Sequence, residues 1–141
     1  MSEAPPPLLL DTHTAIWLTE NEPIASTAVE AIDAAYQTGG VLLVSPITAW
    51  EVGLLVSRSL LSLVADPKRW FQRLLAIPGL RLADLSPDIL IASSFLPGTP
   101  PRDPADRIIL ATARDLGATL ITRDRLLLKY SEDGQVSTIA C

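Results

Sequence analysis

Short hydrophobic runs separated by turn residues recur along the whole chain. Five of these runs have the length of β-strands, and they cover 8–11, 41–45, 80–83, 119–122 and, more weakly, 136–139. Their hydrophobicity is continuous rather than alternating, which is typical of strands buried on both faces of a parallel sheet. The pattern therefore predicts a central, mainly parallel sheet of four to five strands.

Capping pairs between these runs predict the helices. A Ser or Asp stands directly before a Pro four times, at Ser45, Asp66, Ser86 and Asp103. Such a pair favours a helix start, because the side-chain oxygen accepts an unpaired backbone amide and proline needs no amide at the first helical position. We expect helices near 46–57, 67–77, 87–95 and 104–116, and another near 24–37 that ends at a Gly-Gly pair.

Predicted strands and helices alternate along the chain, which indicates an α/β fold with helices on both faces of the sheet. The length of 141 residues and the apolar fraction of 48% suit one domain with a sizeable core. We expect this single domain to span 8–141 and to follow a flexible tail over 1–7.

Composition excludes several classes of protein. The longest stretch without a charged residue, 34–50, is too short and contains too many polar residues, Gly and Pro for a membrane span. No basic residue precedes Arg58, so we expect no secretory signal. The one cysteine, Cys141, excludes an internal disulfide framework and a thiolate zinc site. We therefore expect a cytoplasmic protein without a membrane partner.

The net charge of −5 is distributed unevenly. Residues 1–57 hold seven acids and no Lys or Arg, whereas residues 58–141 hold eleven bases and nine acids. Bulk charge thus does not indicate a nucleic-acid partner, and any basic surface for one must come from the second half of the chain.

Acidic residues fall where ligands collect in α/β proteins. Ligands bind beyond the carboxyl ends of parallel strands, and Asp11 and Asp124 each follow a predicted strand. Glu51 and Asp106 lie on the apolar faces of predicted helices. Each acid also has an ordinary interpretation: a turn or cap for the first two, an Arg pair or a solvent-facing rotation for Glu51, and a helix-dipole contact for Asp106. For Asp103 we favour a capping role.

Four carboxylates that converge on one edge of the sheet would require a cation. Two carboxylates about 5 Å apart repel each other by roughly 3 kcal/mol at an effective dielectric constant near 20. A site made of oxygen ligands favours Mg²⁺ or Mn²⁺, and such an ion can activate a water for phosphodiester cleavage.

Four segments of the sequence resemble the motifs of PIN-domain ribonucleases, with the strongest likeness to the VapC-type toxins of bacterial toxin–antitoxin pairs. The segments are 8–18, 45–52, 102–113 and 120–124, and they occur in the family's order. The resemblance implies that Asp11, Glu51, Asp106 and Asp124 are the catalytic, metal-binding acids. It implies a weaker, supporting role for Thr12 and Thr122, and Asp103 stands one helical turn from Asp106 and could be confused with it.

The resemblance further implies a PIN fold, Mg²⁺- or Mn²⁺-dependent endoribonuclease activity on RNA, a homodimer and a cognate antitoxin that blocks the site. Arg107, Arg123 and Arg125 flank the acids, where they could contact RNA phosphates, neutralise the acids or face water. The mechanism does not need the single histidine, His13. The three tryptophans have apolar helical neighbours, which favours core or dimer contacts over base stacking.

Other functions remain as alternatives. One is a non-catalytic PIN-like module that binds a partner protein, and another is a PIN nuclease with a housekeeping role in RNA processing. A phosphatase with an aspartyl nucleophile fits poorly, because it would need a second acid where His13 stands. A receiver-type signalling domain fits poorly as well, since Lys129 is badly placed for its late lysine.

Overall fold

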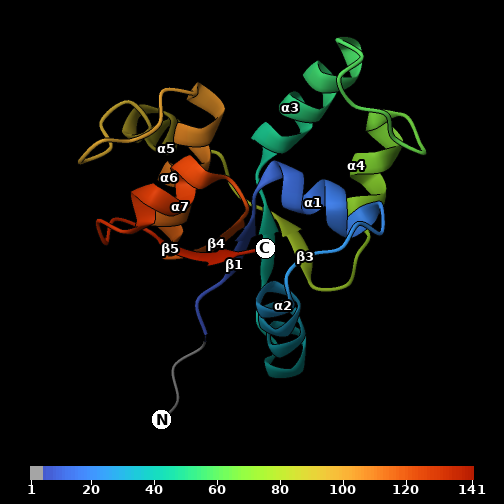
Figure 1. The fold of residues 1–141 in the computed structure, drawn as a ribbon, viewed down its shortest axis with the longest axis horizontal. Helices are drawn as coiled ribbons and strands as arrows, with labels where there is room; N and C mark the ends of the chain where they lie inside the picture. Colours follow the sequence, from blue (N-terminus) through green and yellow to red (C-terminus); the bar gives the residue numbers. More distant parts are fainter. Residues whose placement is uncertain (1–4) are drawn as a thin grey trace.

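The structure is a computed structural model that describes residues 5–141, and Figure 1 shows its arrangement. The strands are β1 (Leu8–Leu10), β2 (Leu42–Val44), β3 (Leu80–Leu82), β4 (Thr119–Thr122) and β5 (Ser137–Ala140). The helices are α1 (Thr12–Thr19), α2 (Ser26–Thr38), α3 (Pro46–Ser57), α4 (Pro67–Leu75), α5 (Pro87–Ala92), α6 (Pro104–Leu116) and α7 (Arg125–Ser131). The predicted α/β fold is confirmed.

The five strands form one fully parallel sheet in the order β3-β2-β1-β4-β5. The chain moves outward from β1 through β2 to β3, and it then crosses to β4 on the other side of β1. Such a reversal opens a crevice at the carboxyl ends of the two central strands. Asp11 directly follows β1 and Asp124 comes two residues after β4, so the topology brings both acids to this crevice.

The four predicted capping pairs all start helices. The side-chain oxygens of Ser45, Asp66, Ser86 and Asp103 accept backbone amides of the first helical turns at 3.0–3.3 Å. Proline follows each cap, where its missing amide costs no hydrogen bond. No helix within residues 5–141 is long and apolar enough to cross a membrane.

The sequence pattern gives no bounds for two helices, α1 and α7, and several predicted ends are wrong by two or three residues. Both helices are short and begin directly after an acid, Asp11 or Asp124, that also caps the helix. In the sequence both acids follow apolar runs and indicate strand ends, and seven or eight residues give little helical periodicity. The predicted helix over 24–37 instead starts at Ser26, after an Ala25 that provides no side-chain cap.

Hydrophobic residues pack on both faces of the sheet. Leu8 and Leu10 of β1 point into a core formed with α1, α2, α3 and α4. Leu9, between them, points into a second core formed with α6 and α7. In Figure 1, α3 and α4 accordingly lie on one side of the sheet and α5, α6 and α7 on the other. The alternation along β1 explains why the strand is hydrophobic throughout.

Part of the predicted tail, residues 5–7, lies in the described part of the chain. Residues 1–4 fall outside the described part of the chain, and residues 5–7 have no regular secondary structure. Pro7 is nevertheless held to β4, because its carbonyl oxygen accepts the Thr119 amide at 2.8 Å.

Candidate functional site

Asp11 is the most buried acid of the candidate site, with only 6% of its surface exposed. One carboxylate oxygen accepts the Thr12 amide at 2.8 Å, which caps α1. The other accepts the Thr122 hydroxyl at 2.7 Å. Burial raises the pKa of Asp11 above its ordinary value, although both hydrogen bonds oppose that shift. Asp11 is therefore fixed in one orientation by the backbone of α1 and by β4.

Glu51 reaches the same corner from the second turn of α3. The Thr12 hydroxyl donates to Glu51 Oε1 at 2.6 Å, so Thr12 contacts Asp11 through its amide and Glu51 through its side chain. Burial raises the pKa of Glu51, and the nearby Asp11 carboxylate raises it further. Glu51 is half-buried and forms no ion pair with any arginine in residues 5–141, so the Arg-pair interpretation does not describe its environment.

Asp124 is joined to Asp11 through Thr122. The Thr122 hydroxyl donates to Asp11 and accepts the Asp124 amide at 3.0 Å. The Asp124 carboxylate caps α7 by accepting the amides of Leu126 and Leu127. Thr12 and Thr122 thus link three of the four predicted acids into one hydrogen-bonded network.

Asp106 completes the group from the third position of α6. Its pKa is raised from 3.8 to about 7, first by burial and then by the carboxylates of Asp103, Asp11, Asp124 and Glu51 in that order. Each of the other candidate acids therefore lies within electrostatic reach of Asp106. Asp103 itself accepts the Asp106 amide at 3.0 Å, as expected for the N-cap of α6.

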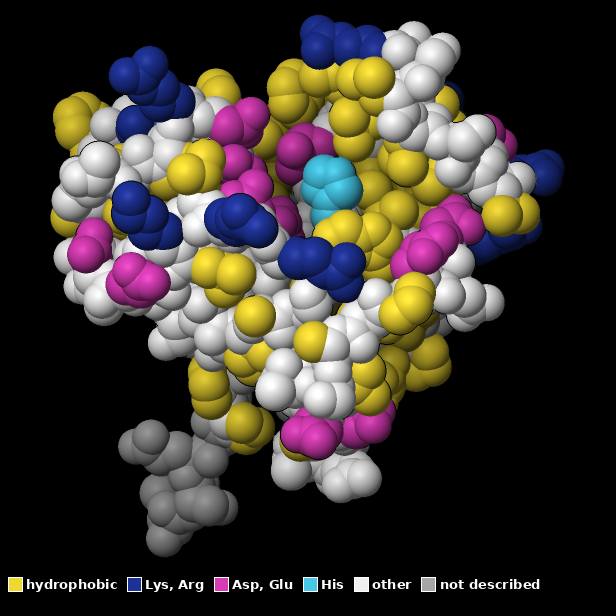
Figure 2. Space-filling view, in the orientation of Figure 1, with side chains coloured by type: hydrophobic (Ala, Val, Ile, Leu, Met, Phe, Trp, Pro, Cys, Tyr) yellow, Lys and Arg dark blue, Asp and Glu magenta, His cyan; other side chains and the backbone are white. Residues whose placement is uncertain are grey.

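The acids line an open cleft rather than a closed cage. Figure 2 shows acidic side chains in a hollow between the two lobes of the molecule, beside the histidine. Within residues 5–141, no three Asp, Glu, His or Cys side chains are close enough to form a preformed metal cage. The described residues also contain no ion pair to these acids, since their one ion pair joins Arg69 and Asp66.

This donor set fits a hydrated divalent cation. Four carboxylates with no protein counter-charge lower their mutual repulsion when a cation lies between them. Mg²⁺ keeps several of its waters in protein sites, so its carboxylate ligands need not close around it. The raised pKa values of Asp11, Glu51 and Asp106 share one main cause, which is burial of the carboxyl groups, and neighbouring carboxylates add to it.

The three predicted phosphate-binding arginines differ in their availability. Arg107 Nε donates to the Pro101 carbonyl at 2.7 Å. Arg123 Nε donates to the Cys141 carbonyl at 2.7 Å, and its guanidinium lies 3.9 Å from the ring centroid of Trp17. Arg125 is exposed at the start of α7 and forms no side-chain hydrogen bond or ion pair within residues 5–141. Arg125 is thus the most accessible of the three.

One buried residue beside the acids was not predicted. Thr48 lies three residues before Glu51 on α3, has no exposed surface, and places its hydroxyl oxygen 2.9 Å from that of Thr12. Its spacing from Glu51 puts it on the same face of the helix, which is the sequence signal that could have identified it. The contact with Thr12 spans 36 residues of sequence and therefore leaves no local pattern.

His13, Trp17 and Trp70 make packing contacts. His13 is exposed at the second position of α1, with its ring 5.8 Å from that of Trp17. Trp70 is buried in the core, where its indole nitrogen donates to Thr19. Trp50 differs from this pattern, because 58% of its surface is exposed beside Glu51.

Comparison with known proteins identifies the family of this chain. Residues 8–133 match the PIN domain, and the chain belongs to the PIN-domain family. A relative of known name is Ribonuclease VapC22 of Mycobacterium tuberculosis, which is 33% identical over 124 residues. That alignment covers 87% of this chain and 91% of the relative.

Solved structures show the same fold. VapBC2 from Rickettsia felis, bound to a promoter DNA fragment, contains a chain that matches with a TM-score of 0.68 and 15% identity, over 95% of this chain and 98% of that one. DNA-bound VapBC from Salmonella typhimurium gives a TM-score of 0.64 and 22% identity, over 96% and 98% of the two chains. At these identities the likeness establishes the fold alone.

Proposed function

We propose that this protein is the toxin of a toxin–antitoxin pair and acts as a Mg²⁺- or Mn²⁺-dependent endoribonuclease. The observation that carries the proposal is the group of acids at the β1–β4 crevice, which have no basic partner in the described residues and raise one another's pKa. The relative named as a ribonuclease supports RNA as the substrate. The proposal includes a cytoplasmic location, where RNA is abundant.

In this proposal, Asp11, Glu51, Asp106 and Asp124 hold the ion. When bound, the ion would lower the pKa of a water and polarise the scissile phosphate. Thr12 and Thr122 orient the carboxylates of Glu51 and Asp11 through the hydrogen bonds described above. Glu51 has one carboxylate oxygen bound to Thr12, and its other oxygen would accept a proton from the attacking water.

Substrate phosphates would meet arginines at the rim of the cleft. Arg125 is the best candidate, since it is exposed and directly follows Asp124. Arg107 and Arg123 would contribute long-range attraction and their remaining N–H groups, because each already donates to a backbone carbonyl.

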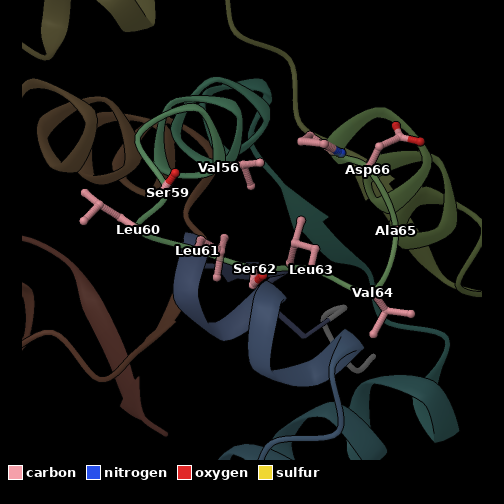
Figure 3. Close-up of a pocket in the computed structure, with 10 residues that line it drawn as sticks. Val56, Ser59, Leu60, Leu61, Ser62, Leu63, Val64, Ala65 and Asp66 are labelled. Carbon is pink, nitrogen blue, oxygen red and sulfur yellow. The ribbon is translucent and has the colours of Figure 1, made fainter.

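Two exposed apolar surfaces support the proposed protein partners, a cognate antitoxin and a second copy of the chain. One is the loop between α3 and α4, which lines a hollow of about 670 Å³ and exposes 70% of Leu60 and 88% of Val64 (Figure 3). The other includes Ile91 on α5 and Phe95 just beyond it, which are 62% and 79% exposed. Exposed apolar patches of this kind mark interaction surfaces in soluble proteins.

Cleavage of RNA by the antitoxin-free protein tests the proposal. We expect cleavage with Mg²⁺ or Mn²⁺, none with a chelator, and a loss of at least a hundredfold for Asp11→Asn, because that variant removes a ligand charge. His13→Ala is the matched control, since it changes a neighbouring exposed residue outside the proposed ligand set, and it should keep most of the activity.

Two outcomes would favour other functions. If the pure protein cleaves no RNA in a broad panel and Asp11→Asn still binds the antitoxin, the chain is a binding module. If cleavage is metal-dependent but no antitoxin gene lies beside this one, a housekeeping nuclease becomes the better interpretation.

A further inference from the structure

A chain of hydroxyl groups runs through the dry interior next to the candidate site. The oxygens of Thr48 and Thr12 are 2.9 Å apart, and Thr12 lies 2.6 Å from Glu51 Oε1. Thr48 has no exposed surface and Thr12 only 1%, so water does not satisfy either hydroxyl. Their hydrogen bonds must therefore come from these contacts.

The donor and acceptor in each of these hydrogen bonds follow from the number of protons that the hydroxyl groups carry. Each hydroxyl carries one proton to donate, and an ionised carboxylate only accepts. Because Thr12 donates its proton to Glu51, it has none left for Thr48. Thr48 is therefore the donor to Thr12, and the order is Thr48 to Thr12 to Glu51.

This direction gives Thr48 a specific task. Thr12 is the residue that contacts both Asp11 and Glu51, and it can do so only while its hydroxyl points toward Glu51. A donor from Thr48 favours that rotamer, since it satisfies a lone pair of Thr12 and leaves the Thr12 proton for the carboxylate. Hydrogen-bonded hydroxyls in series also polarise one another and strengthen each bond.

We propose that Thr48 is a positioning residue, whose buried hydroxyl fixes Thr12 and thereby holds Glu51 in place to bind the divalent ion. The inference rests on the proposed function, since it assumes that Glu51 is a ligand. Groups that orient ligands from outside commonly change metal affinity by 10–100-fold when they are removed.

The test compares one substitution that removes the hydroxyl at nearly constant volume with one that keeps it. Thr48→Val replaces the hydroxyl by a methyl group, whereas Thr48→Ser keeps the hydroxyl and loses only the methyl group. Mn²⁺ affinity is measured without RNA by calorimetry or by electron paramagnetic resonance, and half-saturating Mn²⁺ is measured in the cleavage assay. Circular dichroism checks that each variant is folded.

We expect Thr48→Val to bind Mn²⁺ about tenfold more weakly, and Thr48→Ser to bind it within about threefold of the parent protein. Thr112→Val is the matched control, because Thr112 is a buried threonine whose hydroxyl donates to the Ile108 carbonyl of its own helix. It should lose stability without losing Mn²⁺ affinity. Should Thr48→Val not fold, Thr48→Ala takes its place in the same comparison with Thr48→Ser.

Three results would overturn the inference. Equal Mn²⁺ affinity for the parent and Thr48→Val would show that the hydroxyl does nothing for the ion. Equal weakening by Val and Ser would assign the effect to altered packing at this position rather than to the hydroxyl. If the parent protein binds no Mn²⁺ and Asp11→Asn has no effect on RNA, then the proposed function itself fails and the inference fails with it.

Discussion

Neutralising Asp106 should stabilise the metal-free protein at neutral and alkaline pH. Asp106 is the acid whose pKa is raised to about 7 by burial and by the surrounding carboxylates. Asp106→Asn keeps the size of the side chain and removes the charge. Because the folded protein holds its proton more tightly than the unfolded chain does, the Asp106 contribution is fully present below about pH 3.8 and is lost as pH rises through about 7.

The magnitude follows from the shift. A rise from 3.8 to about 7 corresponds to roughly 4 kcal/mol at 1.36 kcal/mol per pH unit, and about two thirds of it falls between pH 5 and pH 8. Asp106 is only partly buried, so solvent screening reduces the part between pH 5 and pH 8 to about 1.5 kcal/mol. For a domain of this size, that equals a rise in melting temperature of about 5 °C.

The assay is thermal or urea unfolding of the parent protein and Asp106→Asn, with a chelator present, at pH 5 and at pH 8. We expect the stability advantage of the variant to be about 1.5 kcal/mol larger at pH 8 than at pH 5. Asp115→Asn provides the control, since Asp115 is exposed at the other end of the same helix and should show a much smaller pH dependence.

Saturating Mn²⁺ should reverse the order of stability. An ion that binds only the folded parent protein stabilises it by mass action, whereas Asp106→Asn has lost one ligand charge and gains less. A stability difference that is the same at pH 5 and pH 8 would refute the electrostatic reasoning. If Mn²⁺ stabilises the variant as much as the parent protein, Asp106 is not a ligand of the ion.

Three further predictions address the reaction, the fold and the partner surface. At low Mn²⁺, the cleavage rate should rise with pH, with a midpoint near the Asp106 pKa of about 7. Higher Mn²⁺ should move this midpoint to lower pH, because the ion binds the deprotonated acid, and an unmoved midpoint would contradict this. Arg123→Lys should lower the free energy of unfolding by about 1 kcal/mol in urea titrations, since Lys cannot both stack on Trp17 and reach the Cys141 carbonyl. Val64→Glu should weaken antitoxin binding or self-association in calorimetry and light scattering while RNA cleavage persists, and unchanged assembly would assign that loop no partner.

The elements that the sequence predicts well are those with a local cause. Ser45 and Asp103 each stand before a proline and accept an amide two or three residues ahead, so a few neighbouring residues determine where α3 and α6 begin. The sheet is equally local in origin, because short apolar runs such as β1 must be buried on both faces.

The bounds of helices α1 and α7 were not predicted because the acid before each helix has two roles, as a helix cap and as a residue of the candidate site. Asp11 caps α1 with one carboxylate oxygen and receives the Thr122 hydroxyl on the other. Asp124 likewise caps α7 at the edge of the cleft. An acid that follows a strand can therefore cap a helix, belong to a site, or do both. Only the three-dimensional structure shows which of these roles it has.

The hydroxyl network could not be predicted because its contacts are long-range. Thr12 is 36 residues from Thr48 and 39 from Glu51, and Thr122 is 111 residues from Asp11. The first two pairs meet because β2 lies beside β1, and the third meets because the chain crosses the sheet and places β4 on the other side of β1. Strand order depends on the packing of whole layers, so no short segment encodes it.

The same topology explains why the site is electrostatically costly for the fold. The acids come from four separate elements, and the raised pKa values of Asp11, Glu51 and Asp106 show that burial, together with the neighbouring carboxylates, makes their charged forms costly for the folded protein. A sequence optimised for folding alone would place neutral residues at the buried Asp11 position and at the half-buried Glu51 and Asp106 positions. The repulsion is relieved by a cation, and it follows that pH and divalent ions should act on the stability of this protein through the same acids.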